Sequence, residues 1–321
     1  MKRLSSNNYA LVFPGQGSQY TGMGLDIFKK FISAEKVFET AEQVTNLDIR
    51  NLSFFGSEDN LMETSIAQPC LLTTNIALYT VFQEHFPIKP KFICGHSAGQ
   101  YAALVAAGVL SFADAIRLIE VRGALMSKTQ GGSMLALKGV TLKQAEKLCR
   151  ENVQPDGVLV TANLNSPEEI VISGDSASIE EAFFSAMENN IKAIPLAVSG
   201  AFHSPLMQEA AQQVAHLFRK FKFNNAYVPV VSNVTAKSVV KGYEWRQLLE
   251  QQIISAVHWE ASIRYIQQQG IEVFVEVGPR QVLSKLIKKI VPSALIFSVE
   301  NVKSLEKTLI ELQEVLQLPV V

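Results

Sequence analysis

A nucleophile elbow is predicted by the glycine and serine spacing of Gly95-His96-Ser97-Ala98-Gly99. In the G-x-S-x-G pattern the serine lies on a sharp turn between a strand and a helix, which exposes its hydroxyl above the sheet. The apolar run Lys91–Cys94 predicts the strand, and the small and apolar residues Ser97–Leu110 predict the helix. Ser97 could then attack an acyl carbon while N–H groups at the helix start stabilise the developing negative charge. The alternative is a tight turn with a capping serine.

A serine nucleophile needs a general base, and the chain has five histidines. Two of them, His85 and His216, fall in amphipathic helical patterns, where surface or packing roles are more usual. His258 lies in a predicted loop, and the side chain of His96 should point away from the hydroxyl of the adjacent serine. His203 lies in a glycine-containing loop before a predicted helix and far downstream of the serine, as in hydrolase-like chain orders. His203 is therefore the candidate base.

Arg122 lies late on a helix that is predicted to run from Ser111 to Met126. The sequence Ser111-Phe112-Ala113-Asp114 resembles a capping box that begins this helix. A planar guanidinium can bind a carboxylate through two parallel hydrogen bonds. An isolated arginine on a helix is more often exposed to solvent, which is the alternative interpretation.

Strands and helices alternate around these residues. Tyr9–Phe13 is predicted to be a buried strand that leads into the glycine-rich loop Pro14–Ser18, and helical patterns follow at Ala34–Val44 and Cys70–Phe86. Later in the chain come a helix, a strand, two helices and a strand, at Pro205–Phe221, Val228–Ser232, Tyr243–Ile253, Ala261–Gln269 and Val273–Val277.

Between about Gly132 and Val198 the predicted order changes. The six elements are strand Ser133–Leu137, helix Thr141–Cys149, strands Val158–Asn163 and Ile170–Ser173, helix Ser178–Asn189 and strand Lys192–Leu196. That βαββαβ order is typical of the ferredoxin-like fold. We therefore predict an α/β protein with one discontinuous domain, residues 1–127 and 199–321, and a ferredoxin-like domain inserted at residues 128–198.

Several motifs occur in an order that matches a known family. The chain resembles the malonyl-CoA:acyl carrier protein transacylase family and the related acyltransferase domains of polyketide synthases, from about Ala10 to about Ile290. Besides the elbow, Arg122 and Phe202-His203-Ser204, the matching segments are Phe13-Pro14-Gly15-Gln16-Gly17-Ser18-Gln19, Gly22-Met23-Gly24, Asn163-Leu164-Asn165-Ser166-Pro167, Ser232-Asn233-Val234-Thr235 and Glu276-Val277-Gly278-Pro279.

The resemblance implies a fold and a set of roles. The large domain is expected to be α/β-hydrolase-like, with the active site in the cleft beside the insertion. His203 would deprotonate Ser97, and the backbone N–H groups of Gln16 and Ala98 would form the oxyanion hole. Gln252 stands at the position of the residue that orients the histidine, so that a neutral carbonyl would replace the aspartate of a triad.

The resemblance also bears on the substrate. Arg122 would bind the free carboxylate of a malonyl group. Phe202 resembles the bulky residue found beside the histidine in malonyl-selective members, although it could simply pack in the core. The chain departs from the family pattern at Gln100, where glutamate is usual, at Ala98, where a larger aliphatic residue is usual, and at Arg280, which stands in place of a glycine.

Composition excludes several other classes of function. The net charge is −1 and no long basic run occurs, so neither nucleic acid nor a membrane is an expected partner. Cys70, Cys94 and Cys149 are widely spaced among apolar residues, which predicts buried thiols without a disulfide or a metal site. Met1–Asn8 lacks the apolar core of a signal peptide, and no apolar run is long enough to cross a bilayer. We expect a cytoplasmic monomer.

The expected activity is that of a malonyl-CoA:acyl carrier protein S-malonyltransferase. Malonyl would pass from malonyl-CoA through an acyl-serine to the phosphopantetheine thiol of an acyl carrier protein, without metal or cofactor, for fatty-acid synthesis or for polyketide synthase modules. One alternative is an acyl carrier protein hydrolase, a proofreading thioesterase, which has no need of Arg122. The other is a non-catalytic carrier-docking subunit, and the joint presence of five residues argues against it: Gln16, Ser97, Arg122, His203 and Gln252.

Overall fold

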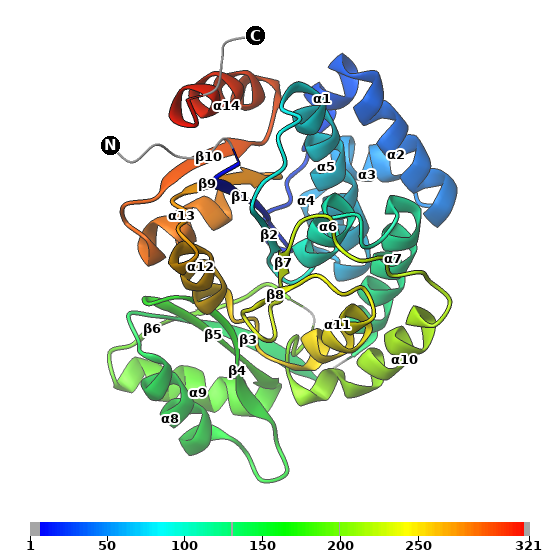
Figure 1. Ribbon diagram of the computed structural model, residues 1–321. Coiled ribbons are helices and arrows are strands. Elements are labelled where there is room, and N and C mark those ends of the chain that lie inside the picture. The colour runs from blue at the N-terminus through cyan, green and yellow to red at the C-terminus, as the bar shows by residue number, and fades with distance from the viewer. Residues whose placement is uncertain (1–6, 130, 199, 318–321) are drawn as a thin grey trace.

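The computed structural model describes residues 7–129, 131–198 and 200–317. Most of the Met1–Asn8 segment, and Ser199, the first residue after the predicted insertion, lie outside the described residues. Two separate sheets organise the described residues, a six-stranded one and a four-stranded one (Figure 1). The predicted fold class is an α/β protein with an α/β-hydrolase-like large domain and a ferredoxin-like (βαββαβ) insertion. It is confirmed by the largely parallel core sheet and the separate antiparallel sheet.

The six-stranded sheet has the order β10-β9-β1-β2-β7-β8. Its strands are β1 (Tyr9–Phe13), β2 (Phe92–Gly95), β7 (Val230–Val231), β8 (Ser238–Val239), β9 (Val273–Val277) and β10 (Leu295–Val299). All neighbours pair in parallel except β7 and β8, which are antiparallel. The sequence patterns predict β1, β2, β7 and β9, whereas β10 carries more exposed residues and was not predicted.

The central strand β1 is buried along its whole length. Leu11 and Phe13 belong to one apolar cluster, whereas Ala10 and Val12 belong to a second cluster on the opposite face of the sheet. A strand that is covered by helices on both faces reads as a continuous apolar run, because both sets of alternating side chains are buried. This explains why β1 lacks a polar face.

Helices cover both faces of this sheet. The first cluster contains residues of α2 (Ile32–Thr45), α5 (Thr64–His85), α6 (Gly99–Ala106), α7 (Phe112–Lys128), α10 (Gln208–Phe218), α11 (Glu244–Ile254) and α14 (Val302–Val315). The second contains residues of α12 (Trp259–Gln268) and α13 (Val282–Ile290). The remaining helices of this part are α1 (Leu25–Lys30), α3 (Ile49–Phe55), α4 (Glu58–Met62) and the 3₁₀ turn Pro205–Met207.

Helix α5 begins at Thr64, well before the predicted start at Cys70. Pro69 lies inside it, early enough that its missing N–H interrupts the helix only near the first turns. The earlier start places Thr64 and Gln68 on a buried helix face. Although α5 has 22 residues, no helix among the described residues combines the length and the hydropathy needed to cross a membrane. The three cysteines are free and buried, as predicted.

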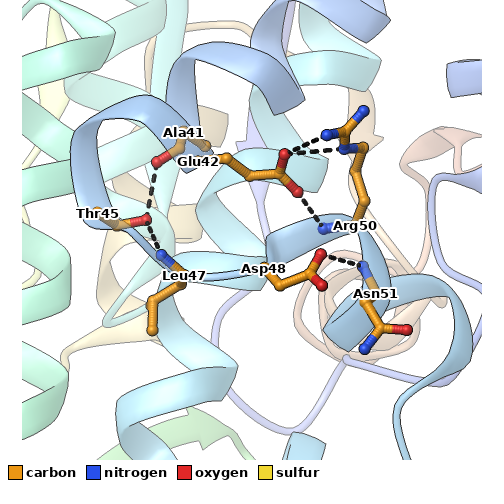
Figure 2. A network of polar contacts seen from close by, with 7 residues as sticks. All are labelled: Ala41, Glu42, Thr45, Leu47, Asp48, Arg50 and Asn51. Carbon is orange, nitrogen blue, oxygen red and sulfur yellow. Dashed lines mark hydrogen bonds and ion pairs between the residues drawn. The ribbon is translucent and has the colours of Figure 1, made fainter.

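A network of side chains fixes the corner between α2 and α3. Figure 2 shows its seven residues, Ala41, Glu42, Thr45, Leu47, Asp48, Arg50 and Asn51. The Glu42 carboxylate accepts hydrogen bonds from the backbone N and from Nε of Arg50, at 2.9 and 2.8 Å, and Asp48 caps α3. This corner holds α3 in place, and the Ser53 carbonyl of α3 accepts a hydrogen bond from the N–H of Gly22 at 2.8 Å. The network thereby supports the glycine-rich opening loop.

The four-stranded sheet has the order β4-β5-β3-β6, and all of its neighbours are antiparallel. Its elements are β3 (Gly132–Lys138), α8 (Leu142–Asn152), β4 (Leu159–Ser166), β5 (Glu169–Asp175), α9 (Ser176–Glu188) and β6 (Lys192–Pro195). Leu135 and Ile172 pack against α8 and α9, whereas Met134 and Val171 on the opposite face join the core of the larger part. One face of this small sheet therefore packs against the part of the molecule that contains the six-stranded sheet.

Backbone and side-chain contacts join the small sheet to the larger part. The N–H of Leu164 donates to the carbonyl of Val257, and the N–H of Val257 donates to that of Ala162, at 2.9 and 2.8 Å. Lys289 of α13 forms an ion pair with Glu168 at 3.2 Å. These contacts hold β4 beside the start of α12.

Candidate active site

Ser97 lies on the turn between the end of β2 at Gly95 and the start of α6 at Gly99. Its φ is 49°, in the left-handed region that few residues other than glycine adopt. A Cβ at Gly95 would lie 2.0 Å from the carbonyl oxygen of Gly99, and one at Gly99 would lie 2.2 Å from that of Phe13. The turn therefore requires both glycines. Backbone strain of this kind clusters at functional sites, where the surrounding structure enforces it.

The side chain of His203 meets that of Ser97. His203 Nε2 lies 2.7 Å from Ser97 Oγ. His203 Nδ1 lies 2.7 Å from the main-chain carbonyl oxygen of Gln252, which can only accept a hydrogen bond. The proton of the neutral ring is therefore on Nδ1, and Nε2 is free to accept the serine proton. His203 also has a left-handed φ, 59°, so both residues of the pair sit on strained backbone.

Gln252 orients His203 through its backbone, and its side chain has a different task. Its Nε2 donates to the carbonyl of Ser97 and to Asn233 Oδ1, at 3.1 and 3.0 Å. Asn233 Oδ1 also accepts from the N–H of Ser97 at 2.9 Å, and its Nδ2 donates to the carbonyl of Gly95 at 2.7 Å. Two buried amide side chains thus hold the strained elbow by its main chain.

Gln100 is the third amide side chain of this network. Its Oε1 accepts from the N–H of Asn233 and from Gln252 Nε2, at 3.0 and 3.2 Å, while its own Nε2 donates to the carbonyl of Val231 at 2.9 Å. An ionised glutamate could make only the accepted bonds, because a carboxylate has no hydrogen to donate. Gln100 therefore satisfies the Val231 carbonyl and keeps a buried charge out of this network.

The opening loop that carries Gln16 lies against the elbow that carries Ala98. A Cβ at Gly15 would come within 2.3 Å of the carbonyl oxygen of His96, so the opening loop packs directly on the elbow. The hydrogen bonds of the turn use the N–H groups of residues 99–101, and the N–H of Ala98 has no acceptor among the described residues. That N–H stands at the start of α6, where helix geometry favours bound negative charge.

His96 points away from the serine hydroxyl. Its Nε2 lies 2.9 Å from Asn165 Oδ1, and Asn165 Nδ2 donates to Glu169 Oε1 at 3.0 Å. Glu169 in turn pairs with Lys138 on the neighbouring strand. Burial lowers the pKa of His96. His96 thus connects the elbow to the small sheet instead of acting on Ser97.

Arg122 is fully buried on α7, and none of the described residues pairs with it as an anion. Its Nη2 lies 3.3 Å from Ser97 Oγ and 3.4 Å from Gln252 Oε1, and its Nη1 donates to Gln68 Oε1 at 2.7 Å. Within the part of the chain that the structure describes, no ion pair includes Arg122 and its Nε has no hydrogen-bond partner. Burial lowers the pKa of this guanidinium. A buried cation that lacks a counter-ion is suited to bind an anion that enters the site.

A cavity of about 460 Å³ lies beside Ser97 and His203, between the two sheets. Met134 and Val171 of the small sheet line one wall. Phe202 is 6% exposed and also lines the cavity, next to His203. The volume is that of a site for one small acyl group and the end of the arm that carries it.

Sequence reasoning missed Gln68, Thr64 and the role of Asn233. Pro69 indicated a helix that begins after Gln68, so neither Gln68 nor Thr64 was assigned to a helix. In the structure, Thr64 accepts a hydrogen bond from Gln16 Nε2 at 3.0 Å. The signal for Gln68 is its place inside the apolar stretch 66–72, because a buried amide side chain needs hydrogen-bond partners.

Comparisons with known proteins agree on one family. Residues 10–310 match the acyl transferase domain family. The malonyl CoA-acyl carrier protein transacylase of Bacillus subtilis (strain 168) is 39% identical over 310 residues, covering 95% of this chain and 97% of that protein. The chain belongs to the malonyl-CoA:acyl carrier protein transacylase family.

Further relatives of this transacylase family place the chain among acyltransferases. The malonyl CoA-acyl carrier protein transacylase of Escherichia coli (strain K12) is 39% identical over 287 residues, which cover 88% of this chain and 93% of that protein. The solved transacylase from Coxiella burnetii has a TM-score of 0.93 at 34% identity and covers 96% of this chain and 99% of that one. A malonyl-transacylase solved with its type II polyketide synthase acyl carrier protein has a TM-score of 0.91 at 36% identity, covering 94% and 99%.

The protonation state of His203 in this transacylase predicts a flat pH profile. Burial, followed by the charge of Arg122, lowers the pKa of His203 from 6.5 to about 3. The ring is then neutral, with Nε2 unprotonated, at every pH well above that value. We expect kcat/KM for acylation by malonyl-CoA to stay constant between roughly pH 5 and 8, because this parameter reports the free enzyme. Quenched-flow mass measurement tests this, and a rate that halves near the ordinary histidine pKa would contradict it.

Proposed function

We propose that the chain transfers malonyl from malonyl-CoA to the phosphopantetheine thiol of an acyl carrier protein, through an acyl-serine intermediate on Ser97. The observation that carries this proposal is Arg122, a fully buried guanidinium without an anion whose Nη2 lies 3.3 Å from Ser97 Oγ. A malonyl thioester places a carboxylate one methylene beyond the carbonyl that Ser97 attacks. The guanidinium and the nucleophile are therefore spaced for the two ends of one small acyl group.

Acylation begins with His203 Nε2 taking the proton of Ser97 Oγ as that oxygen bonds to the thioester carbon. The carbonyl oxygen becomes an oxyanion, which the N–H groups of Gln16 and Ala98 stabilise. The carbon–sulfur bond then breaks. The coenzyme A thiolate takes the proton from His203 and leaves, and malonyl remains on Ser97 as an ester.

Deacylation repeats these steps with a different nucleophile. His203 takes the proton of the carrier thiol, and the sulfur attacks the acyl-serine carbon. The tetrahedral oxyanion accepts hydrogen bonds from the same N–H groups. The Ser97 oxygen then leaves and recovers the proton from His203. Every proton moves between His203 and a reacting atom, so the proposed mechanism uses neither a metal nor a cofactor, and coenzyme A is a product.

Replacing Arg122 should change the acyl specificity. Arg122→Ala removes the partner of the malonyl carboxylate, and we expect malonyl transfer to weaken by about 3 kcal/mol, roughly a hundredfold. An acetyl group has no carboxylate to leave unpaired, so its slow transfer should persist or improve. A competition between malonyl-CoA and acetyl-CoA, with acylated carrier protein and free acid both counted, measures the change.

Arg122→Lys is the matched control, since it keeps the charge and loses the second hydrogen bond. It should recover only part of the malonyl activity. Equal losses for malonyl and acetyl in the alanine variant would show that Arg122 supports the fold, and the proposed substrate would then be wrong.

The two rival functions fit the site less well. A hydrolase that clears carrier proteins has no use for a buried cation beside its nucleophile, because water attacks any acyl group. A subunit that only docks carriers does not need the 2.7 Å contact between Ser97 and His203, or two residues held on strained backbone.

The proposed setting is the cytoplasm, where the chain would act as a monomer on a separate carrier protein. Its three free, buried cysteines suit a reducing compartment. The carrier would belong to fatty-acid synthesis or to a polyketide synthase, and similar proteins include a malonyl-transacylase bound to a polyketide carrier. Rates with isolated carrier proteins of the two kinds would distinguish the pathways.

A further inference from the structure

Gln68 lies between the guanidinium of Arg122 and the cavity. Gln68 and Met126 line the cavity, whereas Arg122 is 0% exposed and is not among the lining residues. Gln68 Oε1 accepts from Arg122 Nη1 at 2.7 Å, and its Nε2 faces Met126 Sδ at 3.8 Å. Because a guanidinium only donates hydrogen bonds, the amide oxygen must be the atom that faces it.

All the acceptors around Arg122 are neutral. They belong to Gln68, Gln252 and Ser97. Burying a cation without an anion lowers the stability of the folded protein, and a glutamate at position 68 would fit the same space and supply the missing charge. The amide instead orients the guanidinium without cancelling its charge. This arrangement favours the binding of a substrate carboxylate at the expense of the stability of the folded protein.

A substrate carboxylate that reaches Arg122 can use N–H groups that Gln68 leaves free, because a guanidinium has five donors and Arg122 Nε has no partner among the described residues. The new hydrogen bonds are charge-assisted, and charge-assisted hydrogen bonds are roughly twice as strong as neutral ones. With a carboxylate at position 68, the substrate would bring a second negative charge to one guanidinium, which disfavours its binding.

We propose that Gln68 is a positioning residue that determines specificity for acyl groups carrying a carboxylate. It holds Arg122 through a neutral acceptor, and it leaves the charge of Arg122 to the substrate. The inference rests on the malonyl transfer proposed above and adds the reason why the arginine stays free.

The test compares two replacements that are close in size to glutamine. Gln68→Glu adds the anion, and kcat/KM for malonyl-CoA should fall at least about a hundredfold while that for acetyl-CoA is unchanged or higher. Gln68→Met removes the acceptor without adding charge, and its malonyl activity should stay within about tenfold of wild type. Gln83→Glu adds a charge to the same helix α5, where Gln83 contacts the carbonyl of Phe86. It should leave kcat/KM for both substrates unchanged.

Thermal unfolding supplies a second readout. Gln68→Glu should unfold at or above the temperature of wild type, because Arg122 gains a counter-ion. Equal losses for malonyl and acetyl, or malonyl activity that survives in Gln68→Glu, would overturn the role of Gln68. The wild-type protein in the same experiment tests the proposed function separately, since a wild type without preference for malonyl would refute that function, whatever Gln68→Glu does.

Discussion

Ser97→Ala should form no malonyl-enzyme and should transfer no malonyl. Ser97 Oγ is the hydroxyl that lies 2.7 Å from His203 Nε2, and the elbow that exposes it depends on glycines that no other serine in the sequence has at this spacing. Intact-mass measurement after brief exposure to malonyl-CoA detects the ester on wild type and its absence on the variant. Because alanine keeps the backbone and removes one oxygen, the variant should remain folded.

Ser33→Ala is the matched control for this variant. The Ser33 hydroxyl donates to Glu84 at an exposed position on α2, so its loss should leave acylation unchanged. A malonyl adduct on Ser97→Ala, or none on wild type, would show that the nucleophile is assigned wrongly.

His203→Ala should slow acylation by about a hundredfold to ten-thousandfold, because general-base catalysis contributes that much. The N–H groups of the elbow would still stabilise the oxyanion, so some activity should remain. Single-turnover acylation measures the rate without the later transfer step. His216→Ala on the exposed face of α10 is the control and should leave the acylation rate unchanged.

The backbone of His203 calls for a second variant. Alanine at a φ of 59° is strained, so a loss of activity could reflect the loop as well as the missing base. Asparagine adopts this conformation more readily, and His203→Asn should be at least as stable as His203→Ala and equally slow. Near-normal acylation in either variant would show that another group acts as the base.

Local patterns in the sequence were enough to predict the central strands and the fold class. The apolar runs at β1 and β2 are continuous because helices cover both faces of their sheet, and that property is visible without contacts. The βαββαβ order of the small sheet is likewise a property of successive short segments. The edge strand β10 was missed because it is only partly buried and its pattern is weaker.

The site divides along the same line between local and distant contacts. The elbow and the histidine loop are local patterns, so Ser97 and His203 could be chosen from sequence. Gln68 touches Arg122 across 54 positions of sequence, and Asn233 touches Ser97 across 136, and no local pattern reports such contacts. The use of a main-chain carbonyl to orient His203 was also beyond residue types, since every residue has one.

The most direct test of the central claim is a transfer assay with the two halves of the reaction measured together. The purified protein is mixed with malonyl-CoA and a carrier protein, with or without its phosphopantetheine arm, and all species are followed by intact mass. The structure predicts a malonyl mass on Ser97 within one turnover, then on the carrier that has the arm, and none on the carrier that lacks it. Release of free malonate at the rate of coenzyme A release, with no malonyl on either carrier, would contradict the account and identify a hydrolase.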